Sequence, residues 1–161
     1  MTTIFGLIIS FATTGEIGAF RLGMPGEEAV RLLGRDTGLA APAQRGSGES
    51  VGFKDGSLEI WAGSDRTVWL LGFDAVGTEG RFRTASCIDA SAQETIEAPR
   101  WGELIKELEQ LGCMWRNDDS LTIDDQLAIR TEADVAMVFA RPEPPANEWV
   151  LASLYKSAGV S

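Results

Sequence analysis

Apolar residues recur with helical spacing in two segments of the chain. In residues 100–111 they follow i, i+3, i+4, i+7 and i+10, which places Trp101, Leu104, Ile105, Leu108 and Leu111 on one stripe. Pro99 suits the first turn of this helix, and Gly112 suits the position just past its end. A shorter helix is predicted at residues 25–33, where a proline opens the segment and a glycine follows it.

After each helix the pattern changes to a period of two, which predicts β-strands. Asp55-Gly56 between apolar runs favours a hairpin turn. Residues 17–22 also read as a strand, whereas residues 4–11 combine helical spacing with β-branched residues and suit either element. The strands predicted after the first helix are 51–53, 57–62 and 67–73, and those after the second are 113–116, 126–131, 135–140 and 149–155.

The order of these elements indicates one unit used twice, a helix followed by strands. We expect the units at about residues 16–83 and 99–157, joined by a link at 84–98 that is a loop or a short helix. Both belong to a single domain that spans residues 1–161. Runs of strands after a helix predict an α+β fold, with a curved antiparallel sheet and helices on one of its faces.

Three segments carry a family resemblance: GAFRLGMPGEEAVRLLG (18–34), DGSLEIW (55–61) and VWLLGFD (68–74). Together they resemble the repeating unit of the superfamily of β-lactamase inhibitor proteins and outer-membrane-assembly lipoproteins. They also resemble small actinobacterial proteins, some of them assigned as immunity proteins of polymorphic toxin systems. The resemblance implies the architecture and a protein-binding role, and it transfers no individual contact residue. Pro25 stands where that family favours Ser or Thr, and its secreted inhibitors carry disulfide bonds.

The chain is acidic, with 24 acidic residues against 14 basic ones and a formal charge of −10. This argues against binding of nucleic acid or an anionic membrane, because neutralising phosphates requires Lys and Arg. Nine acids and three bases lie between Glu103 and Asp134, so this window alone has a net charge of −6. The charge serves either solubility or the steering of a basic partner protein.

The residues needed for the common catalytic and metal sites are missing. Histidine is absent, which excludes Ser-His-Asp and Cys-His nucleophiles and the commonest metal ligand. Cys87 and Cys113 are too few for a disulfide framework and indicate a reducing, cytoplasmic location. The apolar segment 4–12 is too short to cross a membrane. We expect no cofactor, no metal and no enzymatic activity, and the oligomeric state stays open.

Two pairs of acids, Asp118-Asp119 and Asp124-Asp125, are the only adjacent aspartates in the window Glu103 to Asp134. Paired carboxylates could supply the acid and base of a glycosidase or ligands for calcium. Both pairs lie in predicted turns, and neighbouring residues of a strand point to opposite faces, so we expect solvated turn acids. As part of the acidic window they are candidate contacts with a basic partner.

Tryptophans suggest a binding surface. Alternation places Glu59 and Trp61 on the face of their strand opposite its other apolar residues. In the next strand it places Trp69 on the face opposite Val68. A strand that is apolar on both faces either has both faces covered by other parts of the protein or presents one face to a partner. We predict an exposed aromatic face with Trp61, Trp69 and the adjacent Arg66. The alternative is that residues 4–11 cover both tryptophans.

These observations favour a non-catalytic bacterial protein-binding module of immunity or inhibitor type, which neutralises a basic toxin or enzyme. A scaffold or assembly protein is the alternative, and a hydrolase that uses carboxylates alone is the third.

Overall fold

The computed structural model describes residues 3–35, 37–40, 50–77, 80–88, 93–141 and 147–158. Its helices are α1 (Ile4–Thr14), α2 (Gly26–Leu33) and α3 (Trp101–Gln110). Its strands are β1 (Val51–Asp55), β2 (Leu58–Ala62), β3 (Val68–Asp74), β4 (Phe82–Arg83), β5 (Thr95–Ile96), β6 (Trp115–Asn117), β7 (Gln126–Thr131), β8 (Ala136–Ala140) and β9 (Val150–Ser157).

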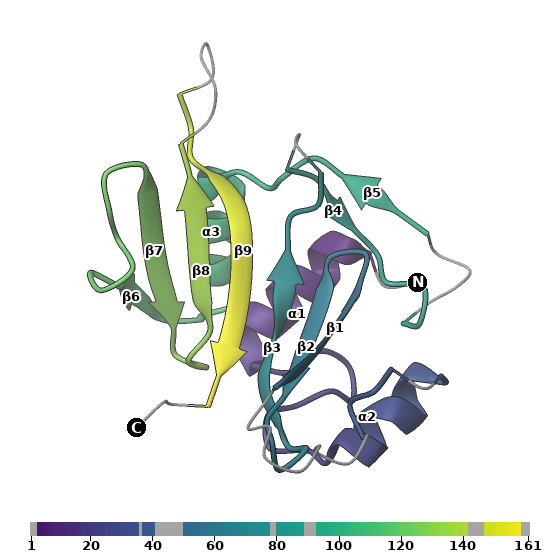
Figure 1. Ribbon diagram of the computed structural model, residues 1–161. Helices are drawn as coiled ribbons and strands as arrows, with labels where there is room; N and C mark the ends of the chain where they lie inside the picture. Colours follow the sequence, from purple (N-terminus) through teal and green to yellow (C-terminus); the bar gives the residue numbers. More distant parts are fainter. Residues whose placement is uncertain are drawn as a thin grey trace.

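Seven strands form one open sheet in the order β1-β2-β3-β9-β8-β7-β6, and each neighbouring pair is antiparallel (Figure 1). The first and second halves of the chain meet where β3 pairs with β9, with Phe73 opposite Leu154 and Gly72 opposite Tyr155. We call this pairing the seam. Strands β4 and β5 form a separate two-stranded sheet. The predicted α+β fold with an antiparallel sheet is therefore confirmed.

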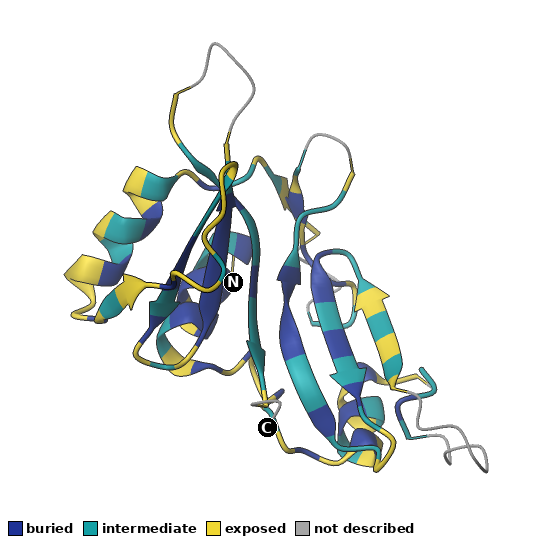
Figure 2. Ribbon diagram, turned by 60° about the vertical axis from the view of Figure 1, so that its left-hand side comes forward, coloured by how far each residue is buried: buried dark blue, intermediate teal, exposed yellow. Residues whose placement is uncertain are grey.

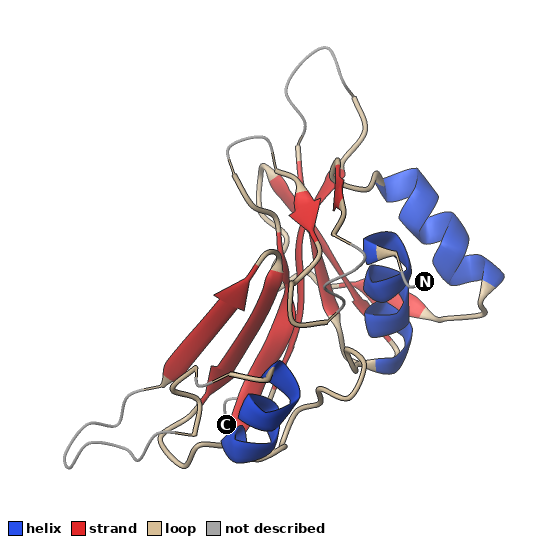
Figure 3. Ribbon diagram, turned by 90° about the vertical axis from the view of Figure 1, so that its right-hand side faces the viewer, coloured by secondary structure: helices blue, strands red, loops and turns tan. Residues whose placement is uncertain are grey.

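Helices α1 and α3 lie on the same face of the twisted sheet, and Figure 3 shows this arrangement from the side. The ring of Phe11 in α1 meets that of Phe73 edge-on, with centroids 6.0 Å apart. In α3 the ring of Trp101 lies 4.9 Å from that of Phe139 and 5.7 Å from that of Trp115. Figure 2 shows the result along β2, where buried residues alternate with partly exposed ones. The core therefore lies between the sheet and these two helices.

The ends of α1 explain why the ambiguous segment 4–11 is a helix. Thr3 caps it, because its Oγ1 accepts a hydrogen bond from the Gly6 amide at 2.9 Å. Gly15 ends it in the left-handed conformation, with φ of 76°. In α3 the Glu103 carboxylate accepts a hydrogen bond from the Arg100 amide at 2.9 Å, which satisfies a donor at the helix start. Local hydrogen bonding thus overrides the β-branched content of residues 4–11.

Two predictions about secondary structure are wrong. Residues 17–22 form a turn and not a strand, because Ile17 and Phe20 exchange backbone hydrogen bonds of 3.0 and 2.9 Å around Gly18, whose φ is 57°. The link at 84–98, predicted as a loop or a short helix, contains β5, which pairs with β4. Residues 89–92 of the link lie outside the described residues.

The helices predicted in the two halves, α2 and α3, do not occupy equivalent positions relative to their strands. Helix α3 packs on the strands that follow it, whereas α2 lies beyond one end of β1 to β3 (Figure 1). On the first-half strands the corresponding position is taken by α1, through the contact of Phe11 with Phe73. The pattern of a helix followed by strands therefore recurs along the chain, but the helix that covers the first-half strands comes from before the predicted unit.

Candidate functional site

The face of the sheet opposite α1 and α3 carries the candidate site. The register places Trp61 opposite Leu70, and Glu59 opposite Gly72, which in turn lies opposite Tyr155. Their neighbours along each strand, such as Ile60, are buried towards the helices. Helices α1 and α3 lie on the other side of the sheet (Figure 3). We call this surface, defined by Glu59, Trp61, Leu70, Gly72 and Tyr155, the open face.

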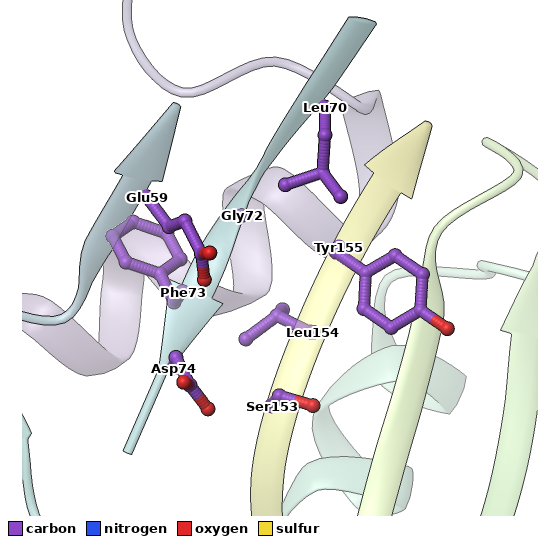
Figure 4. Close-up of a pocket in the computed structure, with 8 residues that line it drawn as sticks. All are labelled: Glu59, Leu70, Gly72, Phe73, Asp74, Ser153, Leu154 and Tyr155. Atoms are coloured by element: carbon purple, nitrogen blue, oxygen red, sulfur yellow. The ribbon is translucent and has the colours of Figure 1, made fainter. Parts of the chain in front are cut away.

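A hollow of about 160 Å³ lies on the open face at the seam. Gly72 leaves this space because it has no side chain, while Leu70 lies further along β3 and Tyr155 extends from β9 (Figure 4). Glu59 and Asp74 also line the hollow, and Figure 4 shows both carboxylates beside β3. The hollow thus combines an apolar and aromatic wall with two acids.

Hydrogen bonds and charges define the orientation of these acids. Glu59 accepts a hydrogen bond of 2.7 Å from the indole Nε1 of Trp61. The Lys54 ammonium lies 3.7 Å from the Glu59 carboxylate and 3.8 Å from that of Asp74, distances typical of loose ion pairs. Partial burial and then the negative charge of Glu59 raise the pKa of Asp74, although Lys54 opposes this shift. One ammonium therefore does not fully compensate two carboxylates.

Trp69 lies at an irregularity in the pairing of β2 with β3. The register shifts between Trp61 and Ala62, so that Ala62 pairs with Val68 and Trp61 pairs with Leu70. This makes Trp69 the extra residue of a β-bulge. Its indole Nε1 is buried and has no hydrogen-bond partner among the described residues. Leu70 is therefore the residue of β3 directly opposite Trp61 in the register, and the pairing of the two tryptophans on one face stays a prediction.

Arg66 shapes the turn between β2 and β3. Its φ is 58°, an uncommon conformation for a residue with a side chain. Its Nη1 donates a hydrogen bond of 3.0 Å to the carbonyl of Gly63, and its own carbonyl accepts one of 2.7 Å from the Gly26 amide. Arg66 thus links the turn to the start of α2, and its role as a partner contact stays a prediction.

The four acids of the paired motifs divide into one buried and three exposed residues. Asp119, Asp124 and Asp125 are exposed, as expected for turn acids. Asp118 is only 5% exposed, so the expectation that it is solvated is wrong. Its carboxylate accepts hydrogen bonds from Ser120 and from Arg130, whose Nε lies 2.9 Å away. The bond from Ser120 is the largest cause that lowers the Asp118 pKa.

This placement removes Asp118 from the candidate surface contacts. Its partner is within the chain, and its ionised form is stabilised, which is the opposite of what a general acid requires. Asp118 is therefore a poor candidate for the general acid of a glycosidase-like pair. Asp119, Asp124 and Asp125 stay predicted contacts for a basic partner.

Large apolar side chains are also exposed outside the open face. Met114 is 72% exposed and Leu111, predicted as part of the buried helical stripe, is 60% exposed just after the end of α3. Met114 lines a second hollow of about 220 Å³ with residues of β6 and β7. This surface lies at the sheet edge formed by β6, at the far side of the sheet from β1.

Sequence reasoning missed Leu70, Gly72, Asp74 and Tyr155 as parts of the site. Alternation in residues 149–155 places Tyr155 on one face of its strand, but nothing local brings it next to Glu59. That neighbourhood depends on the pairing of β3 with β9, residues about half the chain apart.

Other kinds of site can be examined in the part of the chain that the structure describes. There, His, Cys, Asp and Glu side chains form no group of three or more that could hold a metal ion. Cys113 is buried and Cys87 half-buried, and both are free thiols. None of the helices described has the length and apolar character required to span a membrane.

The fold and the site define an α+β protein with one helix-covered sheet face and one open face that bears a carboxylate-lined hollow. No family model matches the sequence, and comparisons with curated proteins and with solved structures give no match either. The resemblance to inhibitor and immunity proteins therefore stays a prediction.

Proposed function

We propose that this chain is a non-catalytic protein-binding module that docks on a basic partner through its open face. The observation that carries the proposal is the open face itself, where half-buried Leu70 and Tyr155 line an acid-lined hollow and half-buried Trp61 lies opposite Leu70. Partly exposed aromatic residues supply much of the binding energy at protein interfaces. A formal charge of −10 favours a basic partner, because opposite charges accelerate association.

Within this class we propose an immunity or inhibitor role, in which binding neutralises a toxin or an enzyme in the cytoplasm. The absence of histidine supports a role without catalysis of its own. The exposed acids Asp119, Asp124 and Asp125 add to the negative field that would steer the partner. A scaffold or assembly protein would use the same surface but would leave the partner's activity unchanged.

A capture experiment with matched variants tests the binding surface. Leu70→Lys adds a positive charge and removes an apolar side chain on the open face, while Met114→Lys makes the same change at an exposed residue elsewhere. The tagged proteins are used to capture partners from the native cell, and captured proteins are quantified by mass spectrometry. We expect a partner that Met114→Lys retains and Leu70→Lys loses, with binding that weakens as salt is raised.

The outcomes separate the alternatives. If no captured protein distinguishes the two variants, the open face is not the binding surface. If a partner is found, its activity is measured with and without this chain, in the enzyme assay or by co-expression and growth. Unchanged activity would favour the scaffold role over inhibition.

A further inference from the structure

The hollow at Gly72 exists because two strands approach each other closely at the seam. A Cβ atom at Gly72 would lie 2.4 Å from the Leu154 carbonyl oxygen and 2.8 Å from the Tyr155 Cβ, so no side chain can fill this position without a backbone shift. The space is therefore a fixed part of the sheet. Its volume of about 160 Å³ is sufficient for the end of one long side chain, but not for a folded segment.

The charges at the hollow favour a cation. Glu59 and Asp74 face one ammonium, that of Lys54, at 3.7 and 3.8 Å, which leaves a net charge of −1 for the three groups. The Lys54 side chain is 58% exposed, so displacing it buries no charge. Partial burial, and then repulsion by the Glu59 carboxylate, raises the pKa of Asp74, so a further cation next to its negative form is stabilising.

The walls of the hollow distinguish between cations. Leu70 and Tyr155 both line it, and Figure 4 shows the Tyr155 ring extending from β9. A guanidinium group is planar, donates several hydrogen bonds in a fixed fork and stacks on aromatic rings. An ammonium group is more strongly hydrated and lacks the fork, so it gains less from a flat, partly apolar wall next to two carboxylates.

We propose that the hollow receives an arginine side chain of the partner protein, whose guanidinium displaces Lys54 from Glu59 and Asp74 and stacks against Tyr155. This inference rests on the proposed function, because it names the anchor that a basic partner inserts at the open face. Lys54 then acts as an internal competitor that occupies the carboxylates until the partner binds.

A titration with small probes tests the arginine pocket without the partner. The ¹⁵N-labelled full chain is titrated with N-acetyl-arginine amide and, in parallel, with N-acetyl-lysine amide, and the backbone amide signals of Gly72 and Tyr155 are followed by NMR. We expect saturable shifts at these two residues, with the arginine probe bound about fivefold tighter than the lysine probe because only the guanidinium forks and stacks.

Three variants and one control sharpen the test. Glu59→Gln and Asp74→Asn each remove a carboxylate charge, and each is expected to weaken arginine binding about tenfold. Lys54→Met removes the competitor and is expected to tighten binding about threefold. Asp119→Asn makes the same charge change at an exposed acid outside the hollow and is expected to leave binding within about twofold of the original. The amide spectrum of each variant shows that it is folded.

The pocket is disproved if no saturable shift occurs at Gly72 and Tyr155, or if the lysine probe binds as tightly as the arginine probe. An equal loss of binding in Asp119→Asn and Glu59→Gln would also disprove it, because the attraction would then be that of net charge alone. If the arginine probe does not bind while partner capture still depends on Leu70, the arginine anchor is disproved and the proposed function is retained.

Discussion

Replacement of Asp118 by Asn should destabilise the protein strongly, although the substitution changes few atoms. Asp118 is 5% exposed, and its Oδ2 lies 2.9 and 2.8 Å from the Nε and Nη2 atoms of Arg130. Removing one member of a buried ion pair costs about 3–5 kcal/mol. Because the Arg130 side chain is 24% exposed and keeps an ion pair with Asp134 at 3.0 Å, we expect a smaller cost than that range, about 2–3 kcal/mol.

The dependence of stability on pH gives a second measure of the same interaction. The pKa of Asp118 is lowered in the folded state, so its contribution is fully present above the ordinary carboxyl pKa of about 4. The contribution is lost as the pH falls from there through the folded-state pKa, because protonation then costs the folded protein more than the unfolded chain. Asp118→Asn should therefore show a shallower loss of stability below about pH 4.

Urea unfolding followed by tryptophan fluorescence measures both effects, at pH 7 and at steps down to pH 3. Asp119→Asn is the matched control, because Asp119 is the exposed neighbour with the same charge. We expect the control to change the free energy of unfolding by less than about 0.5 kcal/mol. The reasoning is refuted if the two variants lose equal stability at pH 7, or if Asp118→Asn leaves the acid slope unchanged.

Two further predictions concern the seam and the thiols. Gly72→Ala should destabilise the protein by about 1–3 kcal/mol in the same urea assay, because the added Cβ would meet the β9 backbone. Gly63→Ala is the control: its Cβ meets nothing nearer than 3.4 Å, so it should change stability by less than about 0.5 kcal/mol. Burial and then the charge of Asp55 raise the pKa of Cys87 from 9.0 to about 11. Alkylation of Cys87 by iodoacetamide at pH 8, followed by mass spectrometry, should therefore be roughly 100-fold slower than that of an unperturbed thiol. Asp55→Asn should accelerate that reaction, and an unchanged rate would contradict the role of the Asp55 charge.

Much of the fold follows from local pattern. The apolar stripe of α3 and the alternation in β2, β7 and β8 predict those elements to within one or two residues, because each has one face against the core. The errors occur where local hydrogen bonds determine the backbone conformation. Residues 17–22 alternate as a strand does, yet the backbone bonds between Ile17 and Phe20 close a turn there.

The candidate site was less predictable for a different reason. Alternation assigns Glu59 and Trp61 to one face correctly, but the bulge at Trp69 changes which residue of β3 lies opposite Trp61. The alternating pattern does not reveal this extra residue, so it does not identify Leu70 as the residue directly opposite Trp61. Asp118 shows the same limit for charge, because its burial depends on Arg130, which a neighbouring strand brings next to it.

The hollow itself is a product of the seam and not of either half of the chain. Glu59, Leu70 and Asp74 come from the first half, while Ser153 and Tyr155 come from the last strand. They meet only because β9 returns to pair with β3, and the close approach of these strands is what requires a glycine at position 72. The residue that allows the two halves to join is thus also the one that leaves the space on the open face. Gly72→Ala should therefore lower stability and arginine binding together, whereas Glu59→Gln should lower arginine binding with a much smaller loss of stability.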